Sequence, residues 1–389
     1  MKSSRVLWYG TLLVLCGLLL LGCSDDSGRN EEAELPGGMD PSIAELGLRL
    51  LPAGVDLTGL SAEERRRVIQ GSYLVNGTAA CPDCHNAASG AYLAGGQEFP
   101  LPFADVQGFT TVVARNLTPD ATTGLQMREE DFIATMRTGI DLAESTEENP
   151  QRLLVMPWPT YRFMSLEDLK AIFAFLQRIP AVQNDVRKTF TPPFPLPPVP
   201  FPDIGDDDPV GDPDHVELGL RIPQFFSSAA NDPHFDTFLL QFADAVAQLT
   251  PQERAQVGRG SYLVNANAGC NSCHTDGDGD GDFDEGLLPN SVDVNTAAYL
   301  AGGVNLGVFF GTRLFSRNLT PEPSTGLLLS QEQFFQTLQF GADFRRPGGS
   351  LRIPPHFPVS LHFTRDDLQA VYAYLRVIPP IVNAVEIVP

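Results

Sequence analysis

Basic residues are scarce in this sequence: 26 lysines and arginines stand against 48 aspartates and glutamates among 389 residues, a formal net charge of −22. That charge excludes nucleic acid as a partner and favours proteins with basic surfaces. Methionine is scarce too, with six in the chain and none after residue 164. A metal ligand that comes from the chain after residue 164 therefore cannot be a methionine thioether. The apolar content of 43% excludes a chain that is disordered throughout and suffices for two ordinary domains.

The first 22 residues lack acidic side chains and carry Lys2 and Arg5 ahead of a long apolar run. This pattern predicts a secretory signal peptide over 1–22. Its end resembles a bacterial lipobox, which implies cleavage before Cys23 and lipid attachment to that cysteine; an uncleaved anchor helix is the alternative. The resemblance, with Ser24 next, implies an outer-membrane lipoprotein on the periplasmic or cell-surface side. The polar stretch 23–60 is then expected to be an N-terminal tether.

Beyond Cys16 and Cys23, the chain has no spare cysteine, and the remaining four occur as two pairs, each followed by histidine, in CPDCH and CNSCH. The residues are Cys81, Cys84 and His85 in the first motif and Cys270, Cys273 and His274 in the second. Disulfides or half-sites for zinc would also use paired cysteines. Two CxxCH motifs in an exported chain favour c-type haem attachment, in which both thiols add to the haem vinyl groups and the histidine binds iron. We therefore expect two covalently bound haem c groups.

The chain contains an internal repeat. GSYLVN recurs at 71–76 and 260–265, AYLAGG at 91–96 and 298–303, and RNLTP at 115–119 and 317–321. We expect two domains, over 61–183 and 250–389, with a proline-rich and acidic linker over 184–249 that holds one helical stretch, HFDTFLLQFADAVAQL. The AYLAGG glycines are expected to let backbone approach the haem closely.

Each copy is predicted to open and close with a helix. Ser61 and Thr250 begin capping boxes for the opening helices. Ser165 and Thr364 cap the closing helices, LKAIFAFLQRIP and LQAVYAYLRVIPP, whose apolar residues fall on one face.

Helix, CxxCH, a loop-rich middle with NLTP, a Met-Pro loop and a closing aromatic helix resemble class I cytochrome c. GxYL before the motif, AGG after it, NLTPD, and MPW before the closing helix resemble more narrowly the cytochrome c subunits of periplasmic alcohol and gluconate dehydrogenases. The resemblance covers about 61–183 and 250–385. It implies a mainly α fold of two tandem cytochrome c domains; family members usually have three.

The same resemblance places a distal methionine just before the last helix, which here is Met156 in LLVMPWPTYRF. A thioether ligand favours ferrous iron and raises the reduction potential. The alternatives are that Met156 is a core residue, or that Met164 is the ligand.

The second copy has no methionine to offer. Alignment of the closing helices sets Pro355 opposite Met156, and His356 is the next residue. We expect bis-histidine ligation by His274 and His356, with His362 as runner-up. His215 and His234 are further candidates, and surface histidines with a five-coordinate iron are the alternative.

Two further features, a pair of arginines and an acidic insertion, each allow two interpretations. Arg115 and Arg317, each before NLTP, are expected either to pair with haem propionates or to be ordinary surface arginines. An 18-residue acidic insertion over 275–292 resembles half of a calcium loop. The candidate calcium ligands are Asp276, Asp278, Asp280 and Asp282. The alternative is a solvated acidic loop that binds no calcium.

These patterns favour a dihaem electron carrier over an enzyme. It would serve an unidentified donor and acceptor with basic docking surfaces, or act as the electron-transfer subunit of a dehydrogenase complex. The alternative is a peroxidase-like enzyme or small-ligand sensor with an open second haem, although no acid/base pair with a recognisable spacing marks the second copy.

Overall fold

The computed structural model describes residues 39–100, 111–143, 153, 155–186, 215–226, 234–276, 294–309, 312–345, 349–351 and 362–385. All of them belong to one compact unit, Leu35–Pro389. Below, the first segment is residues 61–183 and the second segment is residues 250–389. The predicted signal peptide and the lipid site at Cys23 lie outside the described residues.

The first half is mainly helical, with one short antiparallel hairpin, β1–β2. Its elements are α1 (Pro41–Arg49), α2 (Ala62–Tyr73), the π-helical turn η1 (Leu74–Thr78), α3 (Pro82–His85), β1 (Glu98–Pro100), β2 (Thr111–Val113), α4 (Glu129–Thr138), α5 (Trp158–Tyr161) and α6 (Leu166–Leu176).

The second half follows a similar order, with hairpin β3–β4 in the place of β1–β2, and adds η2, α8 and the β5–β6 pair. Its elements are α7 (His215–Arg221), the 3-10 turn η2 (Ile222–Phe225), α8 (Phe235–Ala247), α9 (Pro251–Tyr262), the π-helical turn η3 (Leu263–Asn267), α10 (Cys270–His274), β3 (Asn305–Phe309), β4 (Thr312–Phe315), α12 (Gln331–Phe340), β5 (Ala342–Asp343), β6 (Gly349–Ser350) and α13 (Arg365–Leu375). The predicted mainly α fold is confirmed.

The helix starts lie where the sequence predicts them. Ser61 and Thr250 form complete capping boxes at α2 and α9, and Ser165 and Thr364 accept hydrogen bonds from the N3 amides of α6 and α13. Satisfying these otherwise unpaired amides favours helix initiation at those residues.

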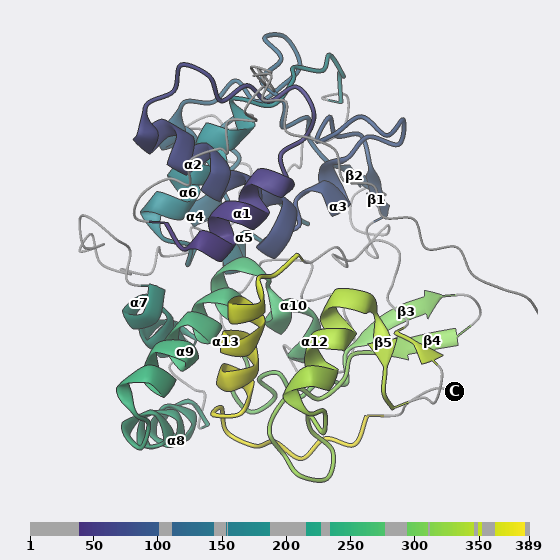
Figure 1. The fold of residues 1–389 in the computed structure, drawn as a ribbon. Helices are drawn as coiled ribbons and strands as arrows, with labels where there is room; N and C mark the ends of the chain where they lie inside the picture. The colour runs from purple at the N-terminus through teal and green to yellow at the C-terminus, as the bar shows by residue number, and fades with distance from the viewer. Residues whose placement is uncertain are drawn as a thin grey trace, which may run out of the picture. The chain divides into compact units, whose positions relative to one another are not determined.

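The opening helix of each segment packs on the closing helix, α2 on α6 and α9 on α13 (Figure 1), and a glycine lies at each contact. A Cβ on Gly71 would lie 2.0 Å from the carbonyl oxygen of Ala171, and one on Gly260 would lie 2.0 Å from that of Ala370. Only glycine allows such an approach, because any side chain there would overlap the neighbouring backbone. The two segments therefore share the same helix crossing.

A second, shorter helix that was not predicted packs on each opening helix. α1 lies in the predicted tether and packs on α2, and α7 lies in the predicted linker and packs on α9. Both contain ELGLR, at 45–49 and 217–221, a repeat that would have revealed them. Gly47 and Gly219 lie at the two contacts, where a Cβ would meet the backbone of Ile69 or Gly258 within 2.4 Å. Each opening helix thus packs against a short helix that lies outside residues 61–183 and 250–389.

α8 forms part of the core of the second half, as its periodicity predicts. Phe238 and Phe242 are buried, and their rings contact those of Phe226, Tyr299 and Tyr374. Among the described residues, no helix is both long enough and apolar enough to cross a membrane.

Candidate haem attachment sites

Each CxxCH motif forms a single helical turn directly after a π-helical turn. In the first, the amide of His85 donates to the carbonyl oxygen of Cys81 at 2.9 Å, and α10 encloses the second motif. Residues at i, i+3 and i+4 of a helix share a face, so both thiols and the imidazole of each motif point the same way. This is the arrangement that one haem requires.

The histidine rings are held in one tautomer. Nδ1 of His85 donates to the carbonyl oxygen of Arg115 at 2.8 Å, and Nδ1 of His274 donates to that of Arg317 at 2.7 Å. A carbonyl can only accept, so the proton lies on Nδ1 and the lone pair of Nε2 is left for a metal. Burial lowers the pKa of both imidazoles, which favours the neutral form that binds iron.

The AYLAGG segments position those two carbonyls. The amide of Gly95 donates to the carbonyl oxygen of His85 at 2.7 Å, and that of Gly302 donates to His274 at 2.8 Å. Both glycines have positive φ, and a Cβ would lie 2.4 and 2.3 Å from the carbonyl carbons of Arg115 and Arg317. The glycines thus allow a close approach to the backbone of Arg115 and Arg317, whose carbonyls hold the histidines, while the expected approach to haem stays a prediction.

The NLTP motifs anchor the same backbone segments to the chain that follows the closing helices. The side-chain nitrogen Nδ2 of Asn116 donates to the carbonyl oxygen of Val182 at 2.8 Å, and Nδ2 of Asn318 donates to the carbonyl oxygen of Ile381 at 2.8 Å. Each asparagine also accepts from the threonine two residues on, Thr118 or Thr320. These residues have a structural role around the histidines.

Arg115 and Arg317 both pair with a carboxylate of their own segment. Arg115 contacts Asp141, and Arg317 makes a bidentate pair with Asp343 at 2.8 and 2.6 Å. Both aspartates are buried. Each pair holds in place the residue whose carbonyl accepts from the histidine, a positioning role that the sequence did not reveal.

The four motif cysteines are free thiols and are half-buried. Burial raises the pKa of Cys81, Cys270 and Cys273 to about 12 and that of Cys84 to about 11. Neutral thiols beside an oriented imidazole fit a thioether-linked haem in both segments. Among the described residues, no group of three or more His, Cys, Asp or Glu side chains could hold a bare metal ion.

Comparison with known proteins agrees with this geometry. The chain is 25% identical over 341 residues to the cytochrome c subunit of alcohol dehydrogenase (quinone) from Gluconacetobacter polyoxogenes, covering 85% of this chain and 60% of that protein. It is 26% identical over 319 residues to the gluconate 2-dehydrogenase cytochrome c subunit of Pantoea cypripedii, covering 79% and 59%. It is 26% identical over 343 residues to the fructose dehydrogenase cytochrome subunit of Gluconobacter japonicus, covering 85% and 57%.

The chain resembles cytochrome c subunits of dehydrogenases. The resemblance inferred from the motifs is thereby confirmed. No family model matches the chain. It spans about three fifths of the length of these cytochrome subunits.

Of the four main candidates for the sixth ligand, the structure describes Met156, Met164 and His362. Met156 is half-buried and packs against the apolar core, and Met164 is fully buried within it. His362 is exposed, and its carbonyl oxygen lies 2.9 Å from the Cβ position of Gly77. His356 lies outside the described residues.

The chain just before Met156 and the chain before His356 make equivalent hydrogen bonds. The amide of Leu153 donates to the carbonyl oxygen of Gly139 at 2.8 Å, and that of Leu351 donates to Gly341 at 2.7 Å. The loop that leads to Met156 and the loop that leads to His356 thus leave equivalent helix ends, those of α4 and α12.

The other histidine candidates have protein neighbours. Both ring nitrogens of His215 are engaged: Nδ1 accepts from Arg259 at 2.7 Å, and Nε2 lies 3.3 Å from Asp168. His215 is therefore an interface residue and not a free ligand. His234 precedes α8.

The predicted calcium loop is described only at Asp276, whose carbonyl oxygen accepts from the side chain of Asn295 at 2.9 Å. Asp278, Asp280 and Asp282 lie outside the described residues, so the calcium site stays a prediction.

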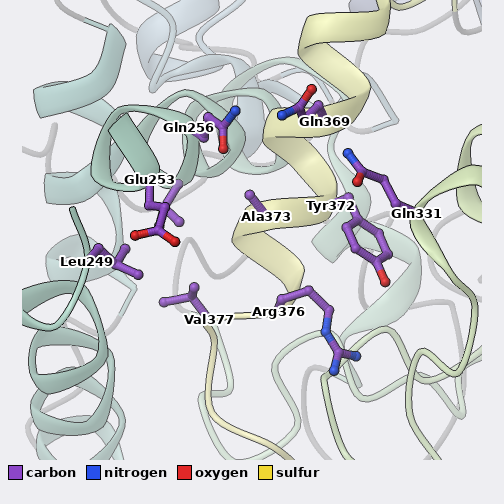
Figure 2. A pocket seen from close by; sticks show the side chains of 10 residues that line it. Leu249, Glu253, Gln256, Gln331, Gln369, Tyr372, Ala373, Arg376 and Val377 are labelled. Atoms are coloured by element: carbon purple, nitrogen blue, oxygen red, sulfur yellow. The ribbon is translucent and has the colours of Figure 1, made fainter. Parts of the chain in front are cut away.

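A cleft of about 260 Å³ lies on the second half of the chain (Figure 2). Its walls come from α9, α12, α13 and the residues that flank them, including Glu253, Gln331 and Arg376. None of the predicted haem residues lines it, so the candidate sites are those of the CxxCH turns.

Proposed function

We propose that this chain is a dihaem c-type cytochrome that carries electrons for a dehydrogenase outside the cytoplasm. The observation that supports this most directly is the duplicated geometry of the proximal site. His85 and His274 each have Nδ1 bound to a backbone carbonyl at under 3 Å, directly after a free CxxC pair. Bound haem would supply a one-electron couple at each site.

In this proposal the four motif cysteines attach the two haems, and the two motif histidines are the proximal ligands. Met156 is the sixth ligand in the first segment, and His356 in the second, with His362 as runner-up. A His/Met iron is held at a higher potential than a bis-histidine iron, because the thioether favours the ferrous state. The two sites would then pass electrons in one preferred direction.

Contacts between the segments support transfer within the chain. Ser272, between the two cysteines of CNSCH, has its hydroxyl 3.4 Å from that of Thr160 in the first segment. Thr78, which ends η1, donates to the side-chain oxygen of Asn267 in η3 at 3.3 Å. The second attachment motif thus lies directly against the first segment.

The location and partners belong to the same proposal. A signal peptide and a lipid on Cys23 would place the protein in the periplasm or at the cell surface, attached to the outer membrane. The excess of 22 negative charges favours a donor or acceptor with a basic docking surface. The dehydrogenases of the similar cytochrome subunits indicate what kind of enzyme the donor is.

Haem counting tests the proposal. The purified holoprotein should contain two covalently bound haems per chain by pyridine haemochrome assay. C81A/C84A and C270A/C273A should each retain one. A wild-type value of one, or two variants that both retain two, would contradict the assignment.

Low-temperature EPR and optical spectra of the ferric protein, alone and with cyanide or peroxide, test the ligands. We expect two low-spin signals, with the methionine-to-iron band arising from one haem only. A high-spin signal that shifts when ligand is added would mean an open second iron, and would favour the peroxidase-like or sensor function instead.

A further inference from the structure

Two buried tyrosines connect the segments. The hydroxyl of Tyr262, on α9 of the second segment, donates to Oδ2 of Asp168 at 2.6 Å and accepts from the amide of Ser165 at 2.9 Å. Both partners are at the start of α6 in the first segment. Burial, and next the negative charge of Asp168, raise the pKa of Tyr262 well above its ordinary value, so the hydroxyl keeps its proton and remains a donor.

Tyr73 makes the reverse connection. Its hydroxyl, on α2 of the first segment, contacts Oδ2 of Asp367 and accepts from the amide of Thr364 at 3.4 Å. Those residues begin α13 of the second segment. Tyr73 and Tyr262 occupy the same place in GSYLVN, so each segment contributes the same side chain to the other.

The hydroxyls fill a gap in the helix caps. In the boxes of α2 and α9, the N3 glutamate reaches back to the amide of the N-cap residue, as Glu64 does with Ser61 at 2.9 Å. α6 and α13 have aspartate at N3, which is shorter by one methylene, and only half of the box forms. The tyrosine of the other segment bridges the N-cap amide and the N3 carboxylate, and so completes the cap in trans.

The two connections are joined to each other on one side. Arg259 pairs with Asp367 at 2.9 Å and donates to Nδ1 of His215 at 2.7 Å, and His215 in turn contacts Asp168 at 3.3 Å. The His215 ring also stacks on Tyr262, with centroids 4.3 Å apart. In the first segment, Gln70 occupies the place of Arg259 and binds Asp168. A continuous set of contacts therefore runs from one closing helix to the other.

We propose that Tyr73 and Tyr262 are positioning residues that fix the mutual orientation of the two haem-bearing segments by capping each other's closing helix. This inference rests on the proposed function for its purpose, since it concerns the path between two haems. In the sequence the distal ligand candidates precede the capped helices: Met156 comes before α6, with the short helix α5 between them, and His356 comes before α13. The orientation of each segment is thereby tied to the distal side of the other.

Hydrogen exchange on the holoprotein tests the connection whether or not the chain carries electrons. In Y262F, exchange of the Ser165 amide should rise by about tenfold or more, because a buried donor loses its partner. In Y73F the rise should occur at Thr364, so that each substitution acts in the segment that does not contain it. Y372F is the matched control: its hydroxyl bonds to Leu329 within the second segment at 2.9 Å, and both caps should stay protected.

A rescue variant separates orientation from capping. In Y262F/D168E the longer acid can complete the α6 cap in cis, so protection at Ser165 should return. The magnetic coupling between the two ferric haems, measured by EPR, should be altered in Y262F and remain altered in the double variant. Exchange that rises only around residues 73 and 262, or haem coupling identical in all variants, would overturn the proposal.

Discussion

The two segments of this chain agree closely on the proximal side and differ on the distal side. In both, a helical CxxCH turn, a histidine bound to an arginine carbonyl and a pair of positive-φ glycines recur with nearly the same distances. Where the first segment has Met156, the second has Pro355 followed by His356. The residues around the motif histidines are held by backbone contacts that leave little freedom, whereas in the proposed ligation the sixth ligand is a single loop side chain, which could change between copies without disturbing those contacts.

Removal of the proposed distal thioether should have the largest effect on the difference between the two segments. Met156→Leu nearly keeps the volume of the side chain and removes the proposed thioether ligand. We expect loss of the methionine-to-iron band and a fall of the first haem potential by a sizeable part of the ~0.8 V range over which axial ligands act. A spectroelectrochemical titration of the holoprotein measures both.

Met164→Leu is the matched control, because Met164 is buried in the core of the same segment. The band and both potentials should be unchanged in that variant. A band lost in M164L and kept in M156L would reassign the ligand.

Substitution of Gly95 and Gly302 tests whether both segments need the same close backbone contact beside the motif histidine. Gly95→Ala and Gly302→Ala should each destabilise the protein by about 3 kcal/mol, since φ is positive and the new Cβ would overlap the backbone of Arg115 or Arg317. Chemical denaturation of the holoprotein gives the free energies of unfolding, which should fall by similar amounts in the two segments.

Gly90→Ala separates strain from overlap. Gly90 has φ +84° but nothing within 4 Å of its Cβ position, so its cost should be only about 1 kcal/mol. Equal costs at Gly90 and Gly95 would mean that the close approach to Arg115 is unimportant.

An effect smaller than those at Gly95 and Gly302 concerns acid stability at the first closing helix. Burial disfavours the charge on Asp168, but His215, Tyr262 and Arg259 outweigh it and hold the pKa at about 2. A lowered folded-state pKa gives stability that is present above the ordinary value of 3.8 and is lost as pH falls toward 2. Between those pH values the wild type should lose about 2 kcal/mol more than Asp168→Asn.

Unfolding titrations at several pH values between 4 and 2 measure that difference. Asp366→Asn, at an exposed position in the first turn of α13, is the control and should follow the wild type. Parallel pH profiles for D168N and the wild type would show that the Asp168 contacts do not favour its ionised form.

Much of the local structure was predictable because caps and periodicity act over a few residues. The four capped helices and both CxxCH turns lie where the sequence predicts them. α1 and α7 were missed because short helices give little periodicity, although ELGLR marks both. The pairing of Arg115 with Asp141, and of Tyr262 with Asp168, joins residues 26 and 94 positions apart, and no local pattern reports such partners.

The capping of each closing helix in trans also bears on the order of folding. When the first segment leaves the ribosome, α6 has its N-cap serine but lacks Tyr262, which follows Asp168 by 94 residues. Its cap can be completed only after the second opening helix has been synthesised and has docked. The first segment therefore reaches its final stability late, and the two segments should fold to completion as one cooperative unit.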